Sequence, residues 1–171
     1  KTIIEKFERD HLDKIVKLYQ DTFRASPYFE NFTFEESKKE ILSYLNIYNG
    51  GILLLAIDSN NEPIGFLGAT IGKSFLSLNI LNKMLRNGIE VLTDYYISNI
   101  IVDINFREKG IGSKLLDTFI NNYNNKNIFL RTSNDIKNKN VIDFYKKKGF
   151  KISDNTEEFV STPKINEPID K

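Results

Sequence analysis

The segment FREKGIGSKLL (residues 106–116) lies between an apolar stretch and a helical pattern. Gly110 and Gly112 remove two side chains where the helix begins, so a ligand can approach the backbone there. The first N–H groups of a helix have no acceptor within the helix, and they carry a partial positive charge that suits phosphate. Arg107 and Lys109 add two full positive charges beside them. The segment therefore predicts either an anion-binding helix start or a tight strand-to-helix turn that needs glycine for its geometry.

Two well-known phosphate-binding motifs do not fit the chain. A dinucleotide-binding fingerprint requires a further glycine three residues after Gly112, where Leu115 stands. The tripeptide Gly-Lys-Ser at 72–74 resembles the end of a P-loop, but only three residues separate it from Gly68 instead of the four that the motif requires. The sequence therefore predicts neither dinucleotide binding nor nucleotide hydrolysis.

Length and composition narrow the class of protein. The chain has 171 residues, 40% of them hydrophobic, and this length predicts one domain with a substantial core. It contains no cysteine, which excludes disulfides, thiolate nucleophiles and zinc knuckles; its single histidine, His11, leaves little for a metal site, so no metal is expected. No apolar stretch approaches the roughly 20 residues of a membrane span, and the start lacks an export pattern. A cytoplasmic location with no membrane partner is expected.

The net charge of +1 conceals an uneven distribution. Residues 1–104 and residues 152–171 each carry a net charge of −3, whereas residues 105–151 carry +7. The basic block coincides with the glycine segment, so an anion is the expected partner. Nucleic acid is the rival interpretation, but the basic residues lie on an apolar-patterned unit without a nucleic-acid-binding signature, so no nucleic acid is expected.

Hydrophobic spacing and turn residues predict a mixed sheet with helices. Asp10 is expected to cap the first helix, and Thr33 with Glu36 forms a capping-box pattern before the second. The stretch 94–102 is apolar on both faces and is expected at the centre of the sheet, with the last two strands at an edge. The expected strands are 2–7, 52–57, 64–71, 94–102, 127–133, 150–153 and 158–162. The expected helices are 10–24, 33–48, 73–88, 111–123 and 139–148.

Three segments together resemble the GNAT superfamily of acetyl-CoA-dependent N-acetyltransferases. They are ISNIIVD (97–103), with Ile100 and Val102 at apolar positions; RxxGxG as Arg107, Gly110 and Gly112; and NxxVxxFYxxxGF as Asn138, Val141, Phe144, Tyr145, Gly149 and Phe150. Two positions depart from the family pattern. Glu108 stands where the family usually has glycine or a basic residue, and Val141 stands where it has alanine.

This resemblance implies an α/β (α+β) fold with one N-acetyltransferase domain over residues 1–171. Its mixed, mostly antiparallel central sheet would have about six or seven strands, flanked by helices on both faces. The helices on the acceptor side would lie in residues 1–104, the acetyl-CoA-binding β-α-β-α core in residues 105–153, and a tail in residues 154–171.

The resemblance also implies that acetyl-CoA is the co-substrate. In the family, amides of the glycine turn hold the pyrophosphate, backbone groups of the fourth strand pair with the pantetheine arm, and an asparagine contacts that arm. Ser113 would cap the turn. The matching cofactor-binding residues here are Ile100, Ile101, Val102, Arg107, Glu108, Lys109, Gly110, Ile111, Gly112, Ser113 and Asn138.

The reaction implied by the resemblance is direct attack of an amine on the thioester, with no covalent enzyme intermediate. Tyr145 aligns with the tyrosine proposed to protonate the departing thiolate, and a phenol with a pKa of about 10 can supply that proton. Packing in the core is the alternative role for this side chain. The general base stays open, because Tyr96 and a base acting through water are both candidates, and Asp94 and Glu90 lie further back along the chain.

The acceptor is expected to be a small cationic amine rather than a protein, because the N-terminal part of the chain is acidic. Tyr28, Phe29, Phe32 and Tyr95 are expected to line its site, although aromatic residues of this kind can instead cover the core. The role of residues 73–88 stays open. A catalytically weak acyl-CoA-binding sensor of the same fold is the alternative function. Either a monomer or a homodimer is expected.

Overall fold

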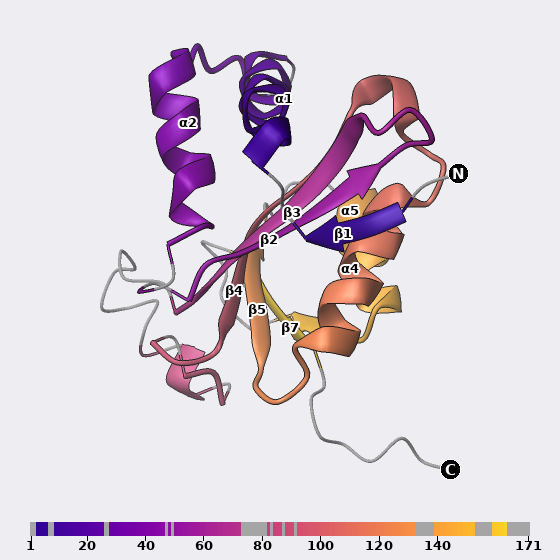
Figure 1. Cartoon of the computed structure of the whole chain (residues 1–171). Coiled ribbons are helices and arrows are strands. Elements are labelled where there is room, and N and C mark those ends of the chain that lie inside the picture. Colours follow the sequence, from indigo (N-terminus) through magenta and orange to yellow (C-terminus); the bar gives the residue numbers. More distant parts are fainter. Residues whose placement is uncertain are drawn as a thin grey trace. The chain divides into compact units, whose positions relative to one another are not determined.

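The computed structural model describes residues 3–6, 9–25, 28–46, 48, 50–72, 82, 84–86, 88–90, 92–132, 139–152 and 159–163 (Figure 1). The chain divides into two compact units. The first comprises Lys1–Thr70 and Asn99–Phe119, and the second comprises Ile71–Ser98 and Ile120–Lys171. Strand β4 (Tyr95–Val102) begins in the second unit and ends in the first.

The first unit is built on three antiparallel strands with helices beside them. Its elements are β1 (Ile3–Lys6), β2 (Ile52–Ile57), β3 (Pro63–Ile71, up to Thr70), the end of β4, the 3-10 turns η1 (Arg9–His11) and η3 (Ile104–Phe106), and the helices α1 (Leu12–Arg24), α2 (Phe34–Ser43) and α4 (Ile111–Asn122, up to Phe119). In the register, Ile3 lies opposite Ile57, and Leu54 opposite Leu67. The N–H of Asp103 donates to the carbonyl of Ile64 at 2.8 Å, so the end of β4 lies beside the start of β3.

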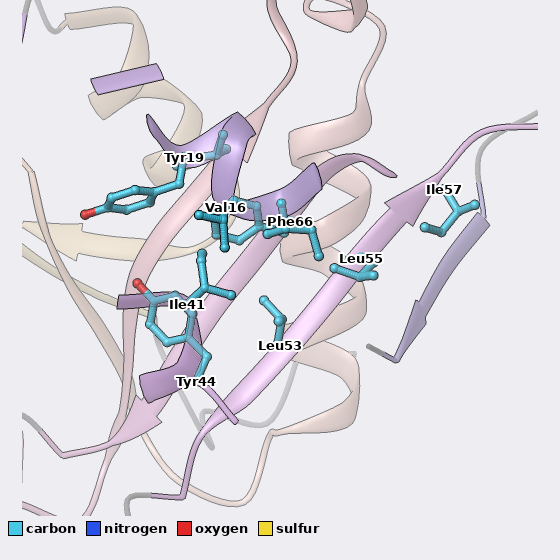
Figure 2. Close-up of a cluster of buried hydrophobic side chains, with 10 residues drawn as sticks. Val16, Tyr19, Ile41, Tyr44, Leu53, Leu55, Ile57 and Phe66 are labelled. Carbon is cyan, nitrogen blue, oxygen red and sulfur yellow. The ribbon is translucent and has the colours of Figure 1, made fainter. Parts of the chain in front are cut away.

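Helices α1 and α2 cover one face of these strands (Figure 1). Figure 2 shows the cluster that they form with β2 and β3, and most of its side chains are fully buried. The buried members are Ile15, Val16, Tyr19, Ile41, Tyr44, Leu53, Leu55, Ile57, Phe66 and Ile101. Alternate residues of β2 point to the opposite face, and Leu54 and Ala56 are buried there too. Because both faces of β2 are covered, its sequence ILLLAI is apolar throughout.

The two helix caps differ in how well the sequence predicts them. The capping box is confirmed: Thr33 Oγ1 accepts from the Glu36 N–H at 3.1 Å, and the Thr33 N–H donates to Glu36 Oε1 at 3.0 Å. These hydrogen bonds lower the pKa of the Glu36 carboxyl. The prediction that Asp10 caps α1 is wrong, because this residue lies inside η1 and the N-cap position belongs to His11. The His11 side chain instead lies with Nε2 3.2 Å from the carbonyl oxygen of Asn61.

Helix α2 ends at Ser43, earlier than the predicted limit near Tyr48. The N–H of Tyr44 donates to Ile41, three residues back, so the last turn tightens. The N–H of Gly51 then donates to the carbonyl of Asn46 at 3.0 Å, which directs the chain into β2.

The second unit contains the remaining strands and α5. Its elements are the start of β4, β5 (Ile128–Thr132), α5 (Lys139–Lys147), β6 (Phe150–Ile152) and β7 (Phe159–Pro163). Strand β5 is parallel to β4, and β7 is antiparallel to both β5 and β6. Residues 159–163, which the sequence assigns to a tail and an edge position, therefore form a strand with a neighbour on each side.

The hydrogen-bonded order of the strands is β1-β2-β3-β4-β5-β7-β6. The prediction of a mixed, mostly antiparallel sheet with helices is confirmed, and β4 lies fourth in this order as its two apolar faces indicate. Of the helix predicted at 73–88, Asn82 and 84–86 are helical and Gly88 follows with a φ of 79°; most of the rest lies outside the described residues. No helix in the described parts of the chain is long and apolar enough to cross a membrane.

The clearest prediction about stability concerns Gly68 on β3. A Cβ atom at this position would lie 2.3 Å from the ring of Tyr44, which is 1% exposed, so one of the two must shift. We expect Gly68→Ala to lower the free energy of unfolding by about 1–3 kcal/mol, measured by urea denaturation. Gly112→Ala is the control, because its Cβ would lie 3.8 Å from Val102 Cγ2, an ordinary contact. Equal losses of stability in the two variants would contradict this account.

Candidate active site

Strand β4 leads into the glycine segment through η3. The Oδ1 atom of Asp103 accepts from the Asn105 N–H at 2.9 Å, and its carbonyl accepts from the Phe106 N–H at 2.9 Å. Arg107 then folds back, because its Nε donates to the carbonyl of Val102 at 3.1 Å. These three hydrogen bonds hold the chain at the carboxyl end of β4, where α4 begins.

The turn before α4 adopts the left-handed backbone conformation twice. The φ angle is 62° at Glu108 and 79° at Gly110. The N–H of Lys114 donates to the carbonyl of Gly110 at 3.0 Å, so Gly110 occupies the N-cap position. The prediction that Ser113 caps the turn is wrong, because this residue lies inside the first turn of α4. The N–H groups of residues 111–113 consequently have no acceptor within the helix.

The surface around this helix start is open and carries charge. Arg107, Glu108, Lys109 and Gly110 are all exposed, and a Cβ on Gly110 would meet no atom within 4 Å. The Nζ atom of Lys109 lies 5.4 Å from the centroid of the Phe106 ring. Glu108 departs from the family pattern at a position where its positive φ favours glycine, so this residue adds both backbone strain and a negative charge to the turn.

Gly112 lies where α4 faces β4. A Cβ there would be 3.8 Å from Val102 Cγ2 and 4.0 Å from Ile100 Cγ2. The ladder between β4 and β5 ends after Tyr96 and Phe129, and β4 continues to Val102. The first unit therefore brings together the cofactor-binding candidates of β4 and of the glycine turn, whereas Asn138 lies outside the described residues.

The tyrosines at the start of β4 are held by packing in the second unit. The Tyr95 hydroxyl donates to Asn125 Oδ1 at 2.9 Å, and its ring meets Tyr123 edge-on at 5.4 Å. Tyr96 is 7% exposed, and its ring centroid lies 5.0 Å from that of Phe129. Packing thus accounts for both rings, and their roles toward the acceptor or as a base stay predictions.

Tyr145 lies on α5 and is half-buried. Its ring centroid is 5.2 Å from Phe144 and 5.5 Å from Phe150, both in edge-on geometry. The two phenylalanines therefore fix the plane of the Tyr145 ring. The side chain belongs to the second unit.

The aromatic residues predicted to line the acceptor site separate into two kinds. Phe32 packs into α1, with its ring 5.9 Å from Tyr19 and 5.7 Å from Phe23. Tyr28 lies against Phe23 at 4.9 Å but stays 53% exposed, and Phe29 is 74% exposed with a φ of 50°. Phe32 therefore covers the core, whereas Tyr28 and Phe29 present apolar surface to the solvent.

A part-buried polar contact between the C-terminal end of α2 and β4 was not predicted from the sequence. Asn99 Nδ2 donates to the Tyr44 hydroxyl at 2.5 Å, and this hydroxyl donates to Glu40 Oε1 at 2.9 Å. Burial raises the pKa of Tyr44, and the negative charge of Glu40 adds to the shift. A glutamate four residues before a tyrosine is a sequence signal for the contact between Glu40 and Tyr44. No local pattern links either residue to Asn99.

Comparisons with known proteins agree with this geometry. A sequence profile of the Acetyltransferase (GNAT) family matches residues 12–150. The chain belongs to this GNAT family. No curated protein sequence matches this GNAT chain significantly.

Solved structures of low sequence identity share the GNAT fold. A Corynebacterium glutamicum protein described as histone acetyltransferase HPA2 and related acetyltransferase is 19% identical, with 98% of each chain covered and a TM-score of 0.69. An acetyltransferase from Thermus thermophilus is 13% identical, with 95% of this chain and 96% of that chain covered and a TM-score of 0.68. The paia N-acetyltransferase from Thermoplasma acidophilum, solved in complex with coenzyme A, is 16% identical, with 95% and 98% covered and a TM-score of 0.65.

Proposed function

We propose that this GNAT chain transfers an acetyl group from acetyl-CoA to a primary amine by direct attack. The observation that carries the proposal is the start of α4, where N–H groups without intrahelical acceptors lie beside Arg107 and Lys109 at the end of β4. Membership of the GNAT family supports acetyl transfer in general, and the coenzyme A complex of a structural relative supports the choice of cofactor.

The residues present fit coenzyme A. Its pyrophosphate needs N–H donors, which residues 111–113 supply next to the exposed turn 107–110, and Gly112 leaves the space above Ile100 and Val102 free of a side chain. The backbone of Ile100–Val102 would accept the pantetheine arm along the part of β4 beyond its ladder with β5. Asn138 is proposed to contact the same arm.

Acetyl-CoA supplies a thioester whose carbonyl carbon is open to attack. The lone pair of the amine nitrogen forms the C–N bond, the C–S bond breaks, and Tyr145 donates its phenol proton to the leaving sulfur. The amine proton goes to a base. Because Tyr96 is almost fully buried against Phe129, a base that acts through water is favoured over this phenol.

A small cationic amine is the proposed acceptor. Burial is the main cause that raises the pKa of Tyr19, and the negative charges of Glu40 and Glu30 raise it further. Both carboxylates therefore act on the same hydroxyl group in the first unit. Exposed aromatic surface on Tyr28 and Phe29 follows directly after α1. Such surroundings favour a cation. A cytoplasmic location and a monomeric or homodimeric state stay predictions from the sequence.

A thiol-release assay with acetyl-CoA and a panel of amines tests the proposal. The panel would contain 1,4-diaminobutane, spermidine, kanamycin, lysine and a peptide with a free α-amine. We expect release of free thiol that depends on the amine and is fastest with the small cations. Binding of coenzyme A by calorimetry without release toward any amine would identify an acyl-CoA sensor instead, and failure to bind coenzyme A would overturn both functions.

A further inference from the structure

Glu40 determines which end of the Asn99 amide faces away from Tyr44. A carboxylate accepts hydrogen bonds and cannot donate them, so the single hydroxyl proton of Tyr44 is committed to Glu40 Oε1. The oxygen of Tyr44 must then accept its second hydrogen bond, and the amide nitrogen of Asn99 is the donor. The amide oxygen of Asn99 therefore points away from Tyr44, and the charge on Glu40 fixes this orientation.

Among the residues that the structure describes, no donor occupies that amide oxygen. The Asn99 side chain is partly exposed, and its Oδ1 makes no hydrogen bond to the residues that the structure describes. Asn99 also directly precedes Ile100 on β4, where the strand is proposed to hold the cofactor arm. Since side chains alternate along a strand, Asn99 projects to the same face as Ile101, which packs with α1 and α2.

The surroundings of this amide are aromatic and negatively charged. Figure 2 shows the hydroxyl groups of Tyr19 and Tyr44 on the same side of the core cluster, directed away from β2. The ring of Tyr19 packs with Phe23 and Phe32, and Glu40 acts on both hydroxyls. A positively charged N–H donor is therefore favoured beside Asn99 over a neutral donor.

We propose that Asn99 Oδ1 accepts a hydrogen bond from the nitrogen of a cationic amine substrate, and that Glu40 acts through Tyr44 to hold the amide in this orientation. The inference rests on the proposed acetyl transfer and names the group that recognises the acceptor. Asn99 binds the substrate, whereas Tyr44 and Glu40 are positioning residues. Once the base has removed one proton from the ammonium group, an N–H bond to Asn99 leaves the nitrogen lone pair free for attack on the thioester.

Glu40→Gln tests the orientation directly. The glutamine amide can donate to Tyr44 as well as accept from it, so the Tyr44 proton is no longer committed to position 40 and the orientation of the Asn99 amide is no longer fixed. With the panel amine that wild type acetylates fastest, we expect KM for this amine to rise, by up to about 10- to 100-fold, the effect of one lost hydrogen bond to a charged group. The dissociation constant of coenzyme A should stay unchanged. Glu35→Gln, an exposed change on the same helix, is the matched control.

Tyr44→Phe gives a second, independent test. This variant keeps the ring that packs on Gly68 but removes the link between Glu40 and Asn99, so KM for the amine should again rise. Tyr48→Phe is its control, because Tyr48 is 93% exposed. Urea denaturation measures the stability of each variant. A rise in KM in a variant that keeps its stability cannot be attributed to partial unfolding.

The outcomes separate this inference from the proposed function. If wild type acetylates an amine and both variants keep its KM, the positioning of the Asn99 amide by Glu40 and Tyr44 is overturned while acetyl transfer stands. If the variants lose coenzyme A binding in proportion to KM, the contact is merely structural and the inference is overturned as well. If wild type acetylates no amine in the panel, the proposed function fails and the inference fails with it.

Discussion

Replacing Tyr145 by phenylalanine should lower the rate of acetyl transfer about 100- to 10,000-fold, the range that general acid catalysis contributes. The change removes only the hydroxyl group. The ring contacts with Phe144 and Phe150 remain, so the position of α5 and the affinity for coenzyme A should not change. Steady-state thiol release measures the turnover, and calorimetry measures coenzyme A binding.

Tyr123→Phe is the matched control for this experiment. Tyr123 is also half-buried in the second unit, and its ring packs edge-on against Tyr95. Removing its hydroxyl should leave turnover unchanged. Equal losses of turnover and of coenzyme A binding in Tyr145→Phe would show that Tyr145 has a structural role. Unchanged turnover would show that another group protonates the thiolate.

Replacing Gly112 by phenylalanine should weaken coenzyme A binding about 100- to 1,000-fold, because two hydrogen bonds to charged phosphate oxygens would be lost. The added ring would extend from a Cβ atom that faces Ile100 and Val102, so it would fill space beside the helix start that the cofactor is proposed to use. The fold should be retained, since a Cβ at this position makes only ordinary contacts with Val102 and Ile100. Calorimetry gives the affinity, and circular dichroism with urea denaturation gives the state of the fold.

Asn121→Phe is the control for the glycine substitution. It places the same ring on an exposed position of α4, away from the start of the helix. Coenzyme A affinity should be unchanged in this control. Wild-type affinity in Gly112→Phe would show that the glycine turn is not the phosphate site, and the Gly-Ile-Gly sequence would then serve only the strand-to-helix turn.

Local sequence patterns predict most elements of this fold. Apolar residues at helical spacing, such as Ile15 and Tyr19, place α1 correctly, and the Thr33–Glu36 pair marks the start of α2. These patterns are reliable because burial of one helix face and capping of one helix end both depend on neighbours a few residues away. The exception is Asp10, where the chain forms a 3-10 turn before the helix begins.

The candidate site was predictable in part. The glycine turn and its charges can be read from residues 107–112, because the missing side chains and the helix start are local features. The aromatic residues could not be assigned in this way. Phe32 and Phe29 belong to the same short loop, but only packing against α1 buries one and leaves the other exposed.

The sequence by itself determined the elements of this GNAT chain and the glycine turn, because spacing, capping and φ preferences act over a few residues. Only the tertiary structure decided that β7 lies between β5 and β6, and that Asn99 meets Tyr44 across 55 positions of the chain. Strand order and such a hydrogen bond depend on which distant surfaces pack together. That packing is a property of the folded chain, and no short stretch of sequence contains it.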